Sequence, residues 1–199
     1  DHGIRCSVST TVVDINFMER ADAFIASLDT LGLAHIAIKR ATYAGRAASG
    51  VNVDGKKWNE HVYRLRALPT KTRLKMKPMY DFDRLDELSD DVLAALELPP
   101  SATNCGAGTA KVYVYTNGDV CPCTCFKDRP MGNLYRSDLD VILTKPPSIQ
   151  VKHPACNACR YFRLCRGGCL GSGYQTTGII GAPDPRCPKV ATTSGKRER

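Results

Sequence analysis

The sequence predicts an α/β fold with two parts: a parallel strand–helix–strand unit, then a small, loop-rich cysteine domain containing a β-hairpin. Three observations predict it. Strand and helix patterns alternate over residues 5–41, nine of the 10 cysteines lie within residues 105–187, and an Asn-Gly turn at 117–118 separates two valine-containing segments. The 199 residues, 43% hydrophobic and 24% charged, fit one globular domain with a smaller appendage.

The first part begins with a predicted strand over residues 5–13, which is rich in Val and Thr. Asn16 is expected to cap a helix, with Glu19 in the capping-box position. Apolar residues recur at helical spacing and predict one buried face: Phe17, Ala21, Phe24, Ile25, Leu28 and Leu31. Gly32 fits the left-handed end of this helix, and residues 35–41 form a second strand. Strand–helix–strand is the right-handed crossover unit of parallel sheets.

Residues 56–100 are expected to form a helical bridge with segregated charges. Lys and Arg dominate residues 56–77, and acids dominate residues 81–97. Two sets of apolar residues give two short helices a buried edge each: Trp58, Val62 and Leu65, then Leu85, Leu88, Val92, Leu93 and Leu96. A solvated helix face is the favoured interpretation of the basic run. Pro99-Pro100 marks the boundary with the cysteine domain.

The cysteine domain opens with the predicted hairpin. Residues 111–115 form one strand, Asn117-Gly118 a tight primed turn, and Val120 begins the return strand. The hairpin therefore holds Cys123 at a fixed distance from the turn. A short helix from Ser137 to Leu143 and a helical turn over residues 157–164 are expected to follow.

The cysteines follow a dense and regular spacing. Cys156, Cys159, Cys165 and Cys169 form C-x2-C-x5-C-x3-C, and Cys187 follows after a further seventeen residues. Clustered thiolates are what polynuclear metal sites need. Buried structural cysteines would instead scatter with the core.

Disulfides and zinc are the alternative uses of these thiols. Disulfides need an oxidising compartment. No apolar signal segment opens the chain, and the cysteines of C-P-C-T-C at 121–125 crowd together. Zinc takes four ligands from two similar knuckles, whereas the spacing here is irregular. Iron–sulfur clusters, each held by four thiolates from distant segments, are favoured.

These cysteines resemble a known signature. The series C-x12-G-x4-C, a gap, then C-x2-C-x5-C-x3-C-x17-C over residues 105–188 is similar to the seven-cysteine pattern of the SPASM domain. That domain is the auxiliary-cluster module at the C-terminus of many radical S-adenosylmethionine (SAM) enzymes. Short strings agree with it as well: 117–120 (N-G-D-V), 132–134 (G-N-L) and 165–169 (C-R-G-G-C).

The resemblance implies two 4Fe–4S clusters with interleaved ligands. It assigns the distal cluster to Cys156, Cys159, Cys165 and Cys187, and the proximal cluster to Cys105, Cys123 and Cys169. The fourth proximal ligand is open between Cys121, Cys125 and none. Cys121 is slightly preferred, because Pro122 favours an extended Cys121 and residues two apart in an extended segment share a face.

The first hundred residues are similar to the end of a partial (β/α)6 radical SAM barrel. Residues 10–16 and 43–47 resemble its fifth and sixth strands. The C-x3-C-x2-C motif of the initiating cluster is absent from residues 1–104, where Cys6 stands alone and is interpreted as a packing residue. The chain is therefore expected to be the C-terminal portion of such an enzyme.

The expected organisation follows from these boundaries: 1–55 the end of the barrel, 56–100 the helical bridge, 101–190 the SPASM domain and 191–199 a disordered tail. The complete enzyme is expected to use SAM, to modify a peptide or protein substrate, and to take electrons from a donor such as ferredoxin or flavodoxin. The clusters would serve electron transfer or substrate engagement. The alternatives are an iron–sulfur electron carrier or adaptor without SAM chemistry, and a zinc-binding interaction domain.

The net charge of +8 raises the question of nucleic acid. Two oxidised clusters of about −2 each would bring the +8 to about +4. No basic motif interleaved with aromatic residues stands out, so no nucleic-acid partner is expected. No run approaches the length of a membrane span, and a cytoplasmic location is expected.

Overall fold

The computed structural model describes residues 4–13, 15–42, 53–99 and 103–191, which fall into two units. The first holds the described residues up to Leu85, and the second begins at Asp86. Residues 43–47, which resemble a barrel strand, Pro100 and the expected tail from residue 192 lie outside the described residues. Where domains begin and end in the whole protein stays a prediction.

The first unit is built on a parallel three-stranded sheet. Strands β1 (Ser7–Val12), β2 (His35–Arg40) and β3 (Leu74–Lys75) lie in the order β1-β2-β3. Ser7 pairs with His35, and Ile36 pairs with Leu74. The predicted parallel crossover is confirmed. The third strand was not predicted, because two residues give too short a pattern to detect in the sequence.

The helices of this unit begin differently from the prediction. A 3-10 helix, η1 (Ile15–Arg20), precedes α1 (Ala21–Asp29). Asn16 therefore lies inside a helical turn, whereas an N-cap residue needs a non-helical backbone. Arg20 occupies the N-cap position of α1 and makes no capping hydrogen bond. The proposed capping box at Asn16 is wrong.

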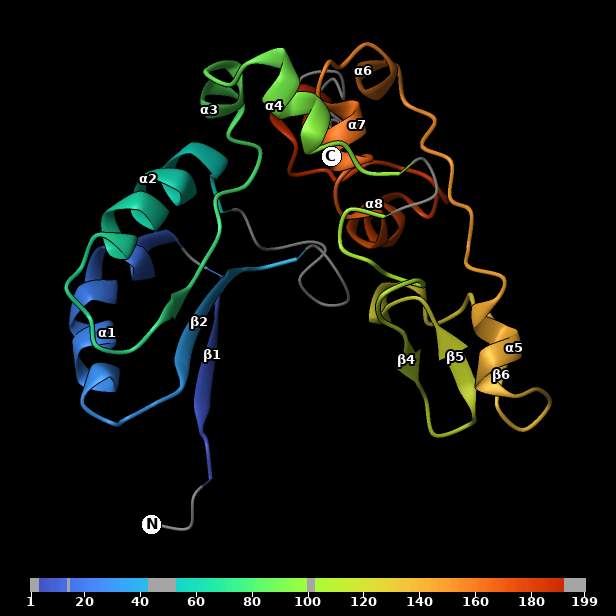
Figure 1. Cartoon of the computed structure of the whole chain (residues 1–199), viewed down its shortest axis with the longest axis horizontal. Coiled ribbons are helices and arrows are strands. Elements are labelled where there is room, and N and C mark those ends of the chain that lie inside the picture. The colour runs from blue at the N-terminus through green and yellow to red at the C-terminus, as the bar shows by residue number, and fades with distance from the viewer. Residues whose placement is uncertain (1–3, 14, 43–52, 100–102, 192–199) are drawn as a thin grey trace, which may run out of the picture. The chain divides into compact units, whose positions relative to one another are not determined.

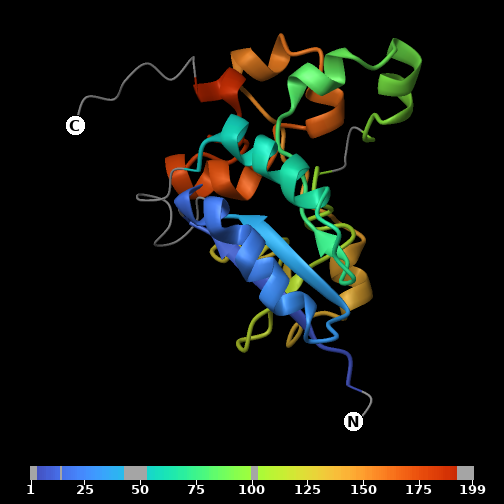
Figure 2. The same cartoon turned by 90° about the vertical axis from the view of Figure 1, so that its left-hand side faces the viewer.

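Helices α1 and α2 (Gly55–Arg66) cover the same face of the sheet (Figure 1), and α1 runs along β2 in the turned view (Figure 2). The core between helices and strands contains Val12, Met18, Ala21, Ile25, Ile36, Ile38, Val53, Trp58, Val62, Leu65 and Met76. Trp58, Val62 and Leu65 are buried as predicted. Leu31 is 63% exposed, because α1 ends at Asp29 and the helical spacing stops there.

The basic side chains of residues 56–77 are exposed, as predicted for a solvated face, but only those up to Arg66 lie on a helix. Helix α2 ends at Arg66, and the chain then turns into β3. The carboxylate of Asp29 accepts hydrogen bonds from the backbone N–H groups of Thr72 (2.6 Å) and Lys71 (3.0 Å). The whole run lies in the sheet unit, because α2 packs into its core and the residues that follow lead into β3.

Two short helices follow, α3 (Phe82–Asp86) and α4 (Asp90–Ala95), and neither contains a buried residue. Val92 and Leu96 are exposed, so the predicted buried edge of this segment is wrong. Helices of five and six residues are too short to sustain an apolar stripe. The segment is held by polar contacts instead: Asp86 forms an ion pair at 3.2 Å with Arg160, the residue after Cys159.

The predicted hairpin is present, with a different turn. Strands β4 (Tyr113–Val114) and β5 (Asp119–Cys121) are antiparallel, and β6 (Gly132–Asn133) pairs with β5. Gly118 has φ +81°, while Asn117 keeps a negative φ. The N–H of Gly118 donates to the carbonyl of Tyr115 at 2.9 Å, which gives a bulged loop instead of a two-residue primed turn.

Helix α5 (Leu139–Leu143) confirms the expected short helix, although Asp138 and not Ser137 is its N-cap residue. The apolar core of the second unit is small: Phe126, Leu170 and Tyr174 are buried together, with Cys123, Ile149 and Val151 packed against them. Small folds with little core are usually stabilised by metals or disulfides. No helix among the described residues is long and apolar enough to cross a bilayer.

Candidate iron–sulfur site

Four of the predicted ligands lie in or beside three short helices. Cys156 lies in α6 (Pro154–Asn157), Cys165 ends α7 (Phe162–Cys165), and Cys187 directly precedes α9 (Pro188–Ala191). Cys159 lies between α6 and α7, where the predicted helical turn over 157–164 is broken in two. Pro154 at the start of α6 favours helix initiation there.

These four thiols interact with one another. Burial raises the pKa of Cys156 to about 11, and the thiols of Cys165, Cys187 and Cys159 raise it too. Burial raises the pKa of Cys187 as well, with contributions from Cys165 and Cys159. Each thiol therefore lies within electrostatic range of the others. The structure brings together the set that the resemblance assigns to the distal cluster.

The backbone reverses between Cys165 and Cys169. Arg166, Gly167 and Gly168 have φ values of +47°, +82° and +72°. Three successive left-handed residues turn the chain sharply, and glycine adopts this conformation at little cost. A Cβ on Gly167 would also lie 2.8 Å from a methyl carbon of Val151. This turn allows two cysteines only four positions apart to belong to different groups.

A second group of thiols surrounds α8 (Leu170–Thr177). Gly171 approaches two of them closely: a Cβ there would lie 3.2 Å from the Sγ atoms of both Cys123 and Cys125. A hydrogen bond from the Cys125 thiol lowers the pKa of Cys123 to about 6 and raises that of Cys125. Cys169 contributes to the raised pKa of Cys125. Burial raises the pKa of Cys169, and Cys105 adds a smaller contribution.

Cys121 has a different environment. It lies on β5, fully buried, and its Sγ is directed to the carbonyl oxygen of Lys127 at 3.7 Å. Burial raises its pKa, with smaller contributions from Asp119 and Cys123. The 3-10 turn η3 (Thr124–Phe126) bends the chain directly after Cys123. The contacts therefore favour Cys125 over Cys121 as the thiol that accompanies Cys123 and Cys169.

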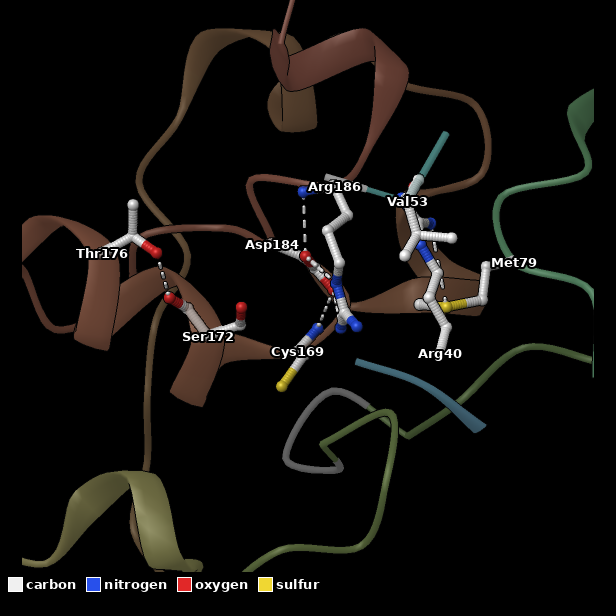
Figure 3. Close-up of polar contacts among 8 residues, drawn as sticks. All are labelled: Arg40, Val53, Met79, Cys169, Ser172, Thr176, Asp184 and Arg186. Atoms are coloured by element: carbon white, nitrogen blue, oxygen red, sulfur yellow. Dashed lines mark hydrogen bonds and ion pairs between the residues drawn. The ribbon is translucent and has the colours of Figure 1, made fainter. Parts of the chain in front are cut away.

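A buried ion pair is hydrogen-bonded to the backbone of Cys169. Asp184 is fully buried and Arg186 is 9% exposed; their closest charged atoms are 2.7 Å apart (Figure 3). The same carboxylate accepts a hydrogen bond from the backbone N–H of Cys169 at 3.2 Å. The N–H of Asp184 in turn donates to the carbonyl of Gly167 at 2.8 Å. This pair was not predicted, because its only signal in the sequence is Asp-Pro-Arg directly before Cys187.

Backbone N–H groups oppose the effect of burial at two thiols. Burial raises the pKa of Cys165 and of Cys187, while the N–H groups of Gly167 and Gly168 lower the pKa of Cys165 and those of Lys189 and Val190 lower that of Cys187. Such donors favour the thiolate, which is the form that binds metal. Hydrogen bonds to ligand sulfur also tune the potential of a bound cluster.

The donor set fits iron–sulfur clusters. All the cysteines are free, and eight of them lie in the two groups. Among the described residues, no three His, Cys, Asp or Glu side chains are close enough together to bind one metal ion. In a 4Fe–4S cluster each thiolate binds a different iron, so the ligand sulfurs lie farther apart than the ligands of a single ion do. Cys6 belongs to neither group; it is exposed just before β1, so its interpretation as a packing residue is wrong.

Comparisons with known proteins agree with this site. Residues 105–169 match the SPASM iron–sulfur cluster-binding domain. The chain is 31% identical over 91 residues to the mycofactocin maturase MftC of Mycobacterium ulcerans (strain Agy99), an alignment that covers 42% of this chain and 25% of MftC.

Two solved structures share the fold. Streptococcus suis SuiB bound to its precursor peptide SuiA has a TM-score of 0.65 at 17% identity over 94% of this chain and 45% of SuiB. Native anSMEcpe with bound AdoMet has a TM-score of 0.54 at 16% identity over 94% of this chain and 52% of that one. The chain thus spans about a quarter to a half of the relatives that it matches. Residues 105–169 are therefore similar to a SPASM iron–sulfur cluster-binding domain, and the chain has the fold of part of SuiB and part of anSMEcpe.

Proposed function

We propose that this chain is the auxiliary-cluster portion of a radical SAM enzyme that modifies a peptide. The observation that supports it most strongly is the division of eight cysteines into two groups within and just beyond the residues that match the SPASM domain. In this proposal the chain binds two 4Fe–4S clusters, and the clusters supply one-electron transfer or engage the substrate.

The ligands follow the two groups of thiols. Cys156, Cys159, Cys165 and Cys187 bind the distal cluster, and Cys105, Cys123 and Cys169 bind the proximal one. We assign the fourth proximal position to Cys125, because its sulfur and that of Cys123 lie on the same side of Gly171. Cys121, the choice that the sequence favours, stays the alternative.

The protein's own groups have definite roles in this proposal. The N–H donors around Cys165 and Cys187 stabilise their thiolates, and Asp184 positions the backbone of Cys169. Cys165, Cys169 and Cys187 are half-buried, which limits the access of water to the clusters that they would bind.

A peptide substrate is supported by the relatives. MftC is named a maturase, and SuiB is seen with its precursor peptide. We extend this substrate class to the whole protein to which this chain belongs. A small electron-transfer protein such as ferredoxin or flavodoxin would supply the electrons.

The enzyme proposal is tested by formation of 5′-deoxyadenosine from SAM under dithionite. This chain, which lacks C-x3-C-x2-C, should produce none. A protein in which an upstream segment supplies that motif should produce it. Production by this chain alone would overturn the proposal. Bound clusters without product from either protein would favour the electron carrier or adaptor.

A further inference from the structure

The sheet unit contains a basic cavity that the proposed function does not explain. Its volume is about 840 Å³, within the range of ligand pockets. Strand β2 contributes His35, Lys39 and Arg40 to its lining, and α2 contributes Trp58 and Arg66. The segment around β3 contributes Arg73, Lys75 and Lys77. All these residues belong to the first unit, and none is a cysteine.

The charge of the lining is of one sign. Seven of its side chains are basic or His, and none is acidic. Among the described residues, Lys39, Arg66, Arg73, Lys75 and Lys77 form no ion pair with a carboxylate. Nearby acids have other partners: Asp22 pairs with Arg64, and Asp29 accepts from backbone N–H groups.

The fold brings these charges together from distant parts of the sequence. The parallel register places Ala37 opposite Lys75, so cations from β2 and β3 flank one another. The pKa of His35 is lowered by burial and by the charges of Lys75 and Arg73. Positive charges gathered in one place repel one another and attract anions.

The lining also contains apolar side chains: Leu74 and Met79 are half-buried, whereas Ile38, Trp58 and Met76 belong to the core behind them. A ligand that matches the cavity therefore has carboxylates beside apolar groups. Single-stranded nucleic acid would need an exposed aromatic platform. Trp58, the only tryptophan, is 1% exposed and its indole N–H donates to the carbonyl of Lys77 at 2.9 Å.

We propose that this cavity binds an acidic segment of the peptide substrate, with Asp or Glu carboxylates paired to Lys39, Arg73 and Lys75 and apolar side chains against Leu74 and Met79. The assignment of a peptide rests on the proposed function. The preference for carboxylates rests on the cavity alone.

The test uses the whole chain with its clusters reconstituted anaerobically, and a fluorescently labelled eight-residue peptide of alternating Glu and Leu. Binding is followed by anisotropy at low and at physiological salt. The variant Arg73→Glu/Lys75→Glu should weaken binding at least tenfold. The matched control Lys56→Glu/Lys57→Glu makes the same change in net charge on residues of α2 outside the cavity, and should change the dissociation constant less than twofold.

A second readout is local. The indole N–H resonance of Trp58 should shift on addition of the peptide, and its assignment is unambiguous because the chain has one tryptophan. The Arg73→Gln/Lys75→Gln variant should also weaken binding, while the indole resonance keeps its free position and so reports an intact fold. Weaker binding at higher salt is expected, since screening acts on these exposed cations.

Equal weakening by the cavity variant and the control would show non-specific attraction and overturn the proposal. So would tighter binding of an oligothymidine that the cavity variant abolishes, or no peptide binding at all. Iron measured in the same samples separates the two claims. Peptide binding without clusters would contradict the proposed function alone, and clusters without peptide binding would contradict this inference alone.

Discussion

The carboxylate of Asp184 accepts a hydrogen bond from the backbone N–H of Cys169 at 3.2 Å while it is paired with Arg186. This contact connects a predicted proximal ligand to the segment that leads to the predicted distal ligand Cys187. The two ligand groups therefore share a structural support although their thiols are separate.

Replacing Asp184 should destabilise the second unit. Asp184→Ala leaves the Arg186 guanidinium buried without its carboxylate, a change that typically costs about 3–5 kcal/mol of unfolding free energy. Urea unfolding of the cluster-free chain measures it. Asp91→Ala, a change at an exposed residue of α4, should cost less than about 0.5 kcal/mol. Similar losses for both variants would contradict a specific role for the buried pair.

The two ligand sets should respond separately to mutation. Cys159→Ala should remove the distal cluster and leave a signal from the proximal one, and Cys169→Ala should do the reverse. Electron paramagnetic resonance of the reduced, reconstituted proteins resolves the two signals. If either change removed both clusters equally, the thiols would form a single site.

Substitutions of Cys125 and of Cys121 are expected to affect the proximal cluster differently. Because Cys125 lies with Cys123 beside Gly171, Cys125→Ser should perturb the proximal cluster signal and lower its iron content. Cys121→Ser should leave both signals intact, since its thiol is directed to the carbonyl of Lys127. Loss of the proximal signal in Cys121→Ser, with a normal Cys125→Ser protein, would favour the ligand that the sequence suggests.

His35 should titrate below the ordinary histidine pKa of 6.5, because burial and the cations Lys75 and Arg73 disfavour its protonated form. It is then largely neutral at pH 7. The variant Lys75→Glu should raise this pKa, since a cation is replaced by an anion. Nuclear magnetic resonance titration of the His35 ring protons provides the measurement. A pKa at or above 6.5 in the unaltered chain would show that no positive field acts there.

Much of the architecture was predictable because its signals are local. Richness in Val and Thr marked β1, helical spacing marked α1 and α2, and Asn117-Gly118 marked the hairpin. The resemblance to the SPASM signature also predicted which thiols lie together around Cys156.

The remaining features depend on long-range contacts or on weak local preferences. Strand β3 has only two paired residues, so its pattern is invisible without its partner β2. Helix α8 contains Gly171 and Gly173, which have low helix propensity; Gly171 lies close to the thiols of Cys123 and Cys125, and Gly173 lies close to the backbone carbonyls of Ala182 and Pro183. The choice between Cys121 and Cys125 depends on the turn η3, which has no clear sequence signal.

The iron and acid-labile sulfide content of the anaerobically reconstituted chain tests the central claim most directly. Two 4Fe–4S clusters predict about eight irons and about eight sulfides per chain, with the brown colour of such clusters. Stoichiometric zinc without iron in protein purified anaerobically would contradict the account and favour a zinc-binding interaction domain. A ceiling of about four irons per chain would contradict the two-cluster assignment.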